Sequence, residues 1–146
     1  MKRSDTGKTF LDLEDINKIL PNNFKLNTER YSRGVYRAEN GDLISISNSR
    51  VYDKGYTSWY YVYADRYKDK GVKYMLFTVG LRGIVLFPMD IFQTYKAGCY
   101  WKDGLRKGEK RYRIDINEVN NKYFFINSSQ NHIKKLDVTQ YFIAYK

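Results

Sequence analysis

The sequence predicts an α+β fold: a mostly antiparallel, strongly bent sheet or half-open barrel of about six or seven strands, with short N-terminal, middle and C-terminal helices. Two observations favour this class. Short runs rich in β-branched and aromatic residues recur between turns that contain Gly or Asn, which is typical of antiparallel strands. Three other segments carry helix-capping residues or a leading proline. A length of 146 residues suits one domain, so we expect a single domain over residues 1–146, with residues 1–9 as a flexible basic arm.

The first element expected is a helix over Leu11–Leu20. Asp12 is a suitable N-cap, and Glu14 and Asp15 place negative charge on the first turn, where it interacts favourably with the helix dipole. Pro21 cannot continue the helix and ends it. Because its acidic residues would repel phosphate, we interpret this helix as one that packs against a sheet.

Strands follow this helix, separated by polar turns. We expect them at Gly34–Ala38, Leu43–Ser47 and Thr57–Tyr63, with a turn at Asn40-Gly41 after the first. A charged segment, Asp65–Gly71, then leads into the most apolar part of the chain.

The stretch Val72–Tyr95 is expected to form the centre of the fold. Its two apolar runs, Lys73–Val79 and Ile84–Phe87, are separated by a four-residue link with two glycines, which predicts a hairpin. Both runs are almost continuously apolar, so we expect them inside the sheet with both faces covered. Pro88 ends the second strand and suits the start of a short helix over Met89–Tyr95.

The second half begins with a polar, glycine-containing segment, Lys96–Lys110. Strands are expected at Arg111–Ile116 and Lys122–Ile126, joined by an Asn-rich turn. A C-terminal helix is predicted after Asp137, which suits an N-cap. Four residues are spaced to lie on one face of that helix: Val138, Tyr141, Phe142 and Tyr145.

The formal charge of +10, with a pI near 9.6, is typical of a nucleic-acid-binding domain. A lysine-rich soluble protein is the alternative. The one cysteine, Cys99, excludes an internal disulfide and a Cys-rich zinc site. No apolar run approaches the roughly 20 residues of a membrane span, and the N-terminus lacks a signal-peptide pattern. We therefore expect a cytoplasmic protein that has no membrane partner.

Signatures of catalysis are weak in this sequence. His132 is the one histidine, so HNH nuclease, zinc hydrolase and two-histidine ribonuclease sites lack support. The acidic residues are scattered, and Glu109 lies in a basic loop without the strand pattern that a carboxylate metal nuclease needs. We expect no catalytic residue, no metal and no cofactor, and we favour a role that is not enzymatic.

The strongest candidate for binding is Lys96–Arg113, where seven basic residues and two acidic ones give a net charge of +5. Cations neutralise phosphates, and aromatic faces stack on bases or sugars. Phosphate contacts are predicted for Lys102, Lys107, Lys110 and Arg33, and base-edge or stacking contacts for Arg106, Arg111, Arg113, Tyr100 and Trp101.

Further basic-aromatic sets precede that segment. One comprises Lys25, Arg30, Tyr31, Arg33, Tyr36 and Arg37, of which Arg33 and Arg37 are also predicted to bind nucleic acid. Another lies in the loop Arg50–Tyr56. The sequence leaves open whether these sets converge on one face. The polar stretch Asn127–His132 is interpreted as a turn, although Asn and Gln can pair with adenine.

The order of features in about half of the chain resembles a known type of module. A Trp59-Tyr60 pair is followed by an apolar strand, Tyr74–Val79, a Gly-containing turn and a proline-started helix, Phe87–Phe92. A basic loop and a strand with Tyr112-Arg113-Ile114 come next. This order resembles a β-rich module that is fused to bacterial restriction endonucleases and related anti-phage proteins. The resemblance implies DNA recognition.

We therefore predict a nucleic-acid-binding domain that recognises duplex DNA in a restriction or phage-defence context, with RNA left open as the ligand. The alternative is a protein-binding module or inhibitor, from a phage or a defence system, that docks its basic-aromatic loop on an acidic partner with Tyr100 and Trp101 as anchors. A nuclease or another defence protein is a candidate partner. A third hypothesis is an RNA-cleaving toxin that uses His132.

Overall fold

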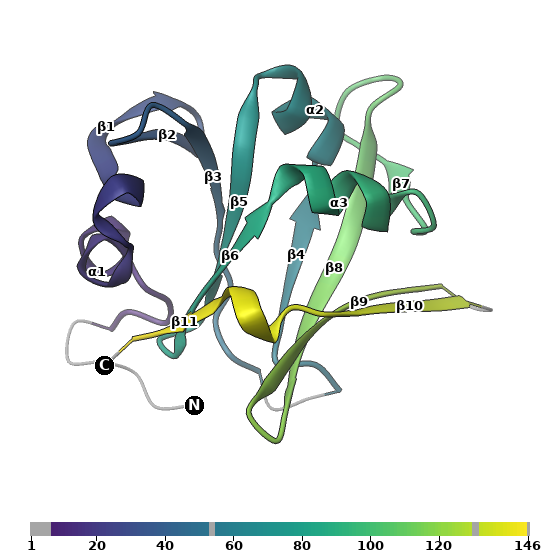
Figure 1. Cartoon of the computed structure of the whole chain (residues 1–146). Helices are drawn as coiled ribbons and strands as arrows, with labels where there is room; N and C mark the ends of the chain where they lie inside the picture. The colour runs from purple at the N-terminus through teal and green to yellow at the C-terminus, as the bar shows by residue number, and fades with distance from the viewer. Residues whose placement is uncertain (1–6, 53–54, 130–131, 146) are drawn as a thin grey trace.

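The computed structural model describes residues 7–52, 55–129 and 132–145 (Figure 1). The helices are α1 (Leu13–Ile19), α2 (Ala64–Asp69) and α3 (Met89–Lys96), and two 3₁₀ turns are η1 (Asn22–Phe24) and η2 (Thr139–Tyr141). The strands are β1 (Leu26–Ser32), β2 (Val35–Ala38), β3 (Leu43–Ser47), β4 (Ser58–Val62), β5 (Val72–Val79), β6 (Gly83–Pro88), β7 (Lys102–Asp103), β8 (Lys110–Val119), β9 (Lys122–Ser129), β10 (His132–Asp137) and β11 (Phe142–Ala144).

These strands form two sheets. The first sheet has the order β1-β2-β3-β5-β6-β11, and the second has the order β10-β9-β8-β4, with β7 also paired to β8. Within the described residues β3 and β5 pair in parallel and the other pairs are antiparallel. The predicted α+β class with mostly antiparallel strands is confirmed. The half-open barrel and the count of about six or seven strands are not confirmed. The strands form two separate sheets, and β4 pairs with β8 in the second one.

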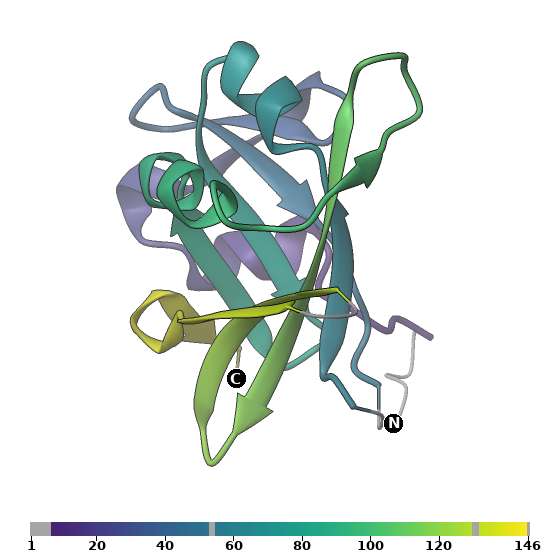
Figure 2. The same cartoon turned by 90° about the vertical axis from the view of Figure 1, so that its right-hand side faces the viewer.

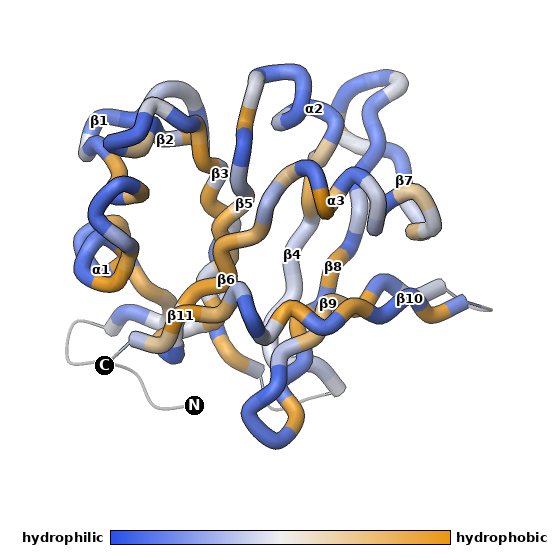
Figure 3. The backbone as a smooth tube through the Cα atoms, in the orientation of Figure 1, coloured by the Kyte–Doolittle hydropathy of each residue, from blue (hydrophilic) through white to orange (hydrophobic). Residues whose placement is uncertain are grey.

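The β5–β6 hairpin lies inside the first sheet, with Leu76 opposite Leu86 and Thr78 opposite Ile84. Successive side chains of a strand point to opposite faces. Leu76 and Ile84 therefore join one buried cluster with α1, whereas Phe77 joins another with the second sheet. Figure 3 shows the hydrophobic colour that follows this hairpin. The predicted hairpin, covered on both faces, is confirmed.

The core between the two sheets is built from aromatic rings. Phe125 of β9 is fully buried, and its ring centroid lies 5.2 Å from that of Phe77 and 4.9 Å from that of Phe87. Phe92 of α3 also contacts Phe125, at 6.2 Å. Helix α3 follows Pro88, as predicted, and buries its apolar side in this cluster. The second sheet is thereby held against the first.

Helix α1 begins with the predicted cap. The Asp12 carboxylate accepts a hydrogen bond from the Asp15 amide at 2.9 Å, and the Asp15 carboxylate accepts one from the Asp12 amide. Lys8 and the Tyr145 hydroxyl also donate to the Asp15 carboxylate, at 2.8 and 2.9 Å. Of the predicted basic arm, residues 1–6 lie outside the described residues. Lys8 is hydrogen-bonded to the Asp15 side chain of α1.

Replacing Asp15 with asparagine should destabilise the protein near pH 7 by about 1–2 kcal/mol, because the cap and the ion pair with Lys8 are both weakened. Burial raises the pKa of Asp15, but hydrogen bonds from Lys8, Tyr145 and the Asp12 amide outweigh it and lower the pKa to about 2. A folded-state pKa below the unfolded one stabilises the protein above about pH 4, and this stabilisation is lost as the pH falls toward 2. Urea unfolding near pH 7 and pH 3 should show a smaller difference between the two proteins at the lower pH; an unchanged difference would contradict this assignment.

The predicted C-terminal helix is wrong. Asp137 ends β10, although its carboxylate accepts a hydrogen bond from the Thr139 amide as a cap would, and η2 forms a single turn. Phe142 is then extended and pairs with Val85 of β6. Pairing with β11 gives hydrogen-bond partners to backbone groups of β6 that would otherwise lie at a sheet edge. The free energy gained from these hydrogen bonds between distant segments outweighs the preference for a helix that the side-chain spacing suggests.

The predicted hairpin after Arg111 is confirmed as β8 and β9. Asn120 and Asn121 have φ angles of 53° and 66°, which suit the two-residue turn between Val119 and Lys122. In the part of the chain that the structure describes, no helix is both long and apolar enough to span a membrane.

Candidate nucleic-acid interface

The outer face of the second sheet gathers aromatic and basic side chains. Alternation along β4 and β8 turns Tyr60 and Tyr112 into the core and the residues beside them outward. Tyr61, which is 40% exposed, lies opposite Arg113 on this outer face. The strand predicted at Thr57–Tyr63 is confirmed as β4, and one of its faces is buried in the core.

The segment between α3 and β7 forms a wall beside this face. The buried Asn127 holds it: its Oδ1 accepts a hydrogen bond from the Tyr100 amide at 2.7 Å, and its Nδ2 donates to the Tyr100 carbonyl at 3.0 Å. The same Nδ2 donates to the Arg113 carbonyl at 3.1 Å. β7 then pairs with β8, with Lys102 opposite Arg111. Asn127 therefore fastens the wall to the sheet, and its side chain is not free to pair with adenine.

A groove of about 800 Å³ lies between this wall, β8 and the end of β9. Figure 2 shows β8 with β4 and β9 beside it. The volume of the groove is within the roughly 300–1,000 Å³ range of small-ligand sites. We call it the sheet groove. Its lining residues are Tyr61, Tyr100, Trp101, Lys102, Arg111, Arg113, Asp115, Ile126, Ser128 and Ser129. Five of the residues predicted to bind nucleic acid are among them: Tyr100, Trp101, Lys102, Arg111 and Arg113.

Cations and rings in this region are held against each other. The Arg111 guanidinium lies 4.2 Å from the centroid of the Tyr61 ring, and the Lys110 ammonium lies 4.7 Å from that of Trp101. Such contacts contribute about 0.5–1 kcal/mol each at exposed sites. They order long cationic side chains before a ligand arrives. The buried Nε of Arg111 has no hydrogen-bond partner among the described residues.

Arg113 is a fixed cation of the groove. Its guanidinium lies 4.5 Å from the Trp59 ring, and its Nε donates to the Asp115 carboxylate at 3.0 Å. Burial lowers the pKa of Arg113, but hydrogen bonds with Asp115 and Tyr56 outweigh burial and raise it above its usual value. Asp115 is the one acidic residue among those that line the sheet groove.

Arg106 and Lys107 lie outside the groove lining, in the exposed loop between β7 and β8. Glu109 fixes the base of this loop, because its carboxylate accepts two hydrogen bonds from the Arg66 guanidinium, both at 2.7 Å. The hydrogen bond from Arg66 lowers the pKa of Glu109. Leu105, next to the two cations, is 85% exposed. The loop is therefore anchored at its base while its tip is presented to solvent.

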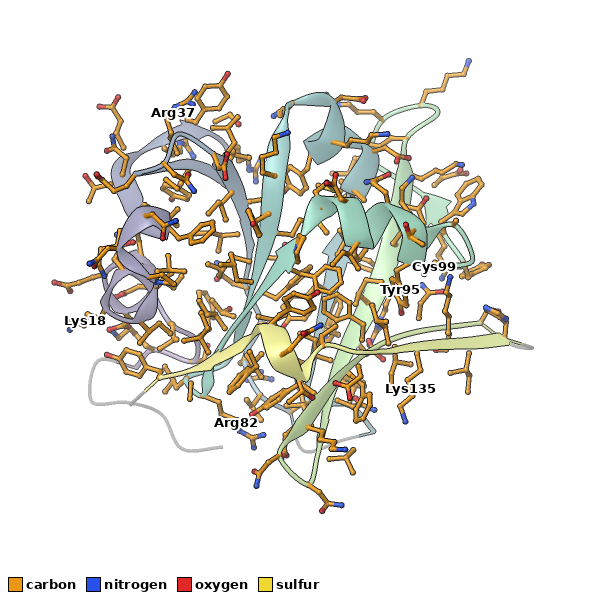
Figure 4. The ribbon with its side chains drawn as sticks, in the orientation of Figure 1. Lys18, Arg37, Arg82, Tyr95, Cys99 and Lys135 are labelled. Carbon is orange, nitrogen blue, oxygen red and sulfur yellow. The ribbon has the colours of Figure 1, made fainter. Side chains whose placement is uncertain are left out.

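Arg33 and Arg37 are not brought to the groove. Arg33 is exposed in the turn between β1 and β2, and Arg37 donates to the Gly41 carbonyl at 2.8 Å and lies over the Tyr31 ring. Figure 4 shows Arg37 on the β1–β2 side of the molecule and Cys99, which is part of the wall, on the other. Arg33 and Arg37 lie away from the groove because β1 and β2 are at one end of the first sheet and, among the described strands, pair with none of the second sheet.

Of the loop Arg50–Tyr56, one described residue approaches the groove: Tyr56 lies under Arg113, with 5.2 Å between the guanidinium and the ring centroid. The groove residues that sequence reasoning missed are Tyr61, Asp115, Ile126, Ser128 and Ser129. Alternation along β4 and along β8 is a signal that could have placed Tyr61 and Asp115 on the outer face. Ile126, Ser128 and Ser129 depend on where β9 runs beside β8, and the part of the predicted turn Asn127–His132 up to Ser129 is the end of that strand.

Neither His132 nor Cys99 is among the residues that line the groove. His132 is exposed, and its Nε2 lies 3.1 Å from the Gly98 carbonyl oxygen. Over residues 7–52, 55–129 and 132–145, no three His, Cys, Asp or Glu side chains group as a metal site requires. Burial raises the pKa of the half-buried Cys99 thiol, which disfavours the reactive thiolate.

Comparisons of the chain with protein-family models, with curated proteins and with solved structures gave no match. The residues that line the groove bring together cationic, aromatic and hydroxyl-bearing side chains.

Proposed function

We propose that the protein binds DNA through the sheet groove and the cationic loop next to it. The observation that supports this most is the meeting of Arg111 and Arg113 with Trp101 and Tyr61 in one groove, although β4 and β8 are far apart in the sequence. Cations that neutralise phosphates beside rings that stack on bases or sugars are the usual means of binding a nucleic acid.

Each cation has a proposed role in this complex. Lys102, Lys107 and Lys110 contact phosphates, and Arg106, Arg111 and Arg113 contact phosphates or base edges, for which the planar guanidinium is suited. Duplex DNA as the ligand, a restriction or phage-defence context and a cytoplasmic location rest on the sequence alone.

Binding to duplex DNA should weaken steeply with salt. If the six cations of the groove and loop each neutralise one phosphate, the logarithm of the affinity falls with a slope of about −5 against the logarithm of salt concentration. The affinity should then fall about a thousandfold between 50 and 200 mM salt. Fluorescence titration of a labelled duplex at several salt concentrations measures this slope.

Undetectable binding at low salt would contradict the proposal, and so would a slope near zero. A duplex RNA of the same sequence and a single DNA strand serve as competitors. Stronger competition by the RNA would replace DNA with RNA as the ligand.

A second candidate function is docking on an acidic protein, and Leu105 favours it. An apolar side chain that is 85% exposed between cations resembles an anchor for a protein surface. Retention of a partner from a cell extract after nuclease treatment, lost with Leu105→Asp, would support this function. Retention that nuclease treatment abolishes would instead favour a nucleic-acid ligand.

A further inference from the structure

Three aromatic side chains line the sheet groove with part of their ring surface open. Tyr61, Tyr100 and Trp101 are 40%, 47% and 42% exposed. A base inside a duplex is stacked on its neighbours and presents only its edges in the grooves. An unpaired base has free faces and can stack on an aromatic ring or on an arginine plane. The groove therefore suits an unpaired base better than a base within the stack.

The lining charges are distributed along β8. Lys102 lies opposite Arg111, and Asp115 lies four residues further along the same strand. At about 3.3 Å per residue, the two ends are about 13 Å apart. The Lys102 ammonium at one end of the groove would attract a phosphate, whereas the Asp115 carboxylate at the other end would repel it.

Asp115 has the chemistry of a base-reading residue. A carboxylate accepts hydrogen bonds only, and its match on a base is an exocyclic amino group, such as N4 of cytosine. The Nε of Arg113 donates a hydrogen bond to Oδ1 of Asp115. The other carboxylate oxygen, Oδ2, can then accept a hydrogen bond from a base. Thymine carries a carbonyl oxygen at the corresponding position and would be repelled. Ser128, which is exposed at the end of β9, adds a hydroxyl to the same groove.

We propose that the sheet groove holds one unpaired base that carries an exocyclic amino group, stacked on Trp101 and hydrogen-bonded to Asp115, with a phosphate of its strand at Lys102. This inference rests on the proposed DNA binding and specifies its ligand. It assigns Trp101 to stacking and Asp115 to base discrimination.

The test uses three short labelled duplexes, one fully paired, one with a single unpaired cytosine and one with a single unpaired thymine. The unpaired cytosine should raise the affinity about tenfold over the paired duplex, and the unpaired thymine should raise it less. Equal affinity for all three would overturn the base site while leaving DNA binding intact. No binding of any duplex at low salt would overturn both proposals.

Two variants separate stacking from hydrogen bonding. Trp101→Ala should bring the ratio of the affinities for the unpaired and the paired duplexes close to one, whatever its effect on the affinity for the paired duplex. Asp115→Ala should make the affinities for the unpaired cytosine and the unpaired thymine equal, because it removes the carboxylate that distinguishes them. Tyr31→Ala, which removes an exposed ring that also lies under an arginine but belongs to β1, is the matched control and should change none of the three affinities. If Trp101→Ala or Asp115→Ala lowers the affinity for all three duplexes by the same factor, the assigned roles are contradicted. Thermal melting checks that the variants are folded.

Discussion

Replacing Arg111 and Arg113 together with glutamine should weaken binding of duplex DNA about a hundredfold at low salt. Each arginine would lose a charge-assisted contact worth about 1.5 kcal/mol, and every 1.4 kcal/mol corresponds to a tenfold change in affinity. The salt slope should also become shallower by about two, because two fewer phosphates are neutralised. Titration of a labelled duplex over a range of salt concentrations measures both quantities.

The matched control is the double variant Arg30→Gln and Arg37→Gln. It changes the net charge by the same amount, but both residues are exposed on β1 and β2, outside the sheet groove. It should lower the affinity by no more than a few-fold, through the long-range field of the protein alone. Equal losses in the two double variants would mean that net charge, and not the groove, attracts DNA.

Replacing Phe125 with alanine should lower the free energy of unfolding by about 3–5 kcal/mol, the usual loss when a buried phenylalanine is truncated. The ring is fully buried and contacts rings from both β5 and β6, at 5.2 Å for Phe77 and 4.9 Å for Phe87. Because this core joins the sheets, we also expect one cooperative unfolding transition, as the predicted single domain requires. Urea unfolding followed by both fluorescence and circular dichroism tests this.

Phe124→Ala is the control for that variant. Phe124 precedes Phe125 on the same strand, faces the other side and lies under the Lys135 ammonium at 4.3 Å. Phe124→Ala should lower the free energy of unfolding by about 1 kcal/mol or less, because the ring is only half-buried. Similar losses for both variants, or two separate transitions in the wild type, would contradict a shared core between the sheets.

The elements that the sequence predicts best are those in which local pattern and tertiary environment agree. The cap at Asp12 and the apolar β5–β6 hairpin lie where their own residues favour them. The strands that the sequence does not predict have distant causes. β1 and β10 are polar, largely exposed strands at the sheet edges, so they lack an apolar alternation. β11 replaces a helix-like pattern because β6 lies beside it.

The candidate site was predictable in part for the same reason. Trp101 and Arg111 lie in one basic-aromatic segment, and a hairpin pairing of β7 with β8 brings them together. Tyr61 and Ser128 reach the groove through β4 and β9, whose positions depend on pairing across the second sheet. Arg33 has the same local composition as the groove residues but lies on the first sheet, since composition does not determine which sheet a strand joins.

Amide chemical-shift mapping during titration with duplex DNA tests the central claim most directly. If DNA binds in the sheet groove, the largest saturable shifts should fall on residues 99–115 and 126–129, and the amides of β1 and β2 should change little. Shifts that are largest on β1 and β2, or no saturable shifts at all, would contradict the account.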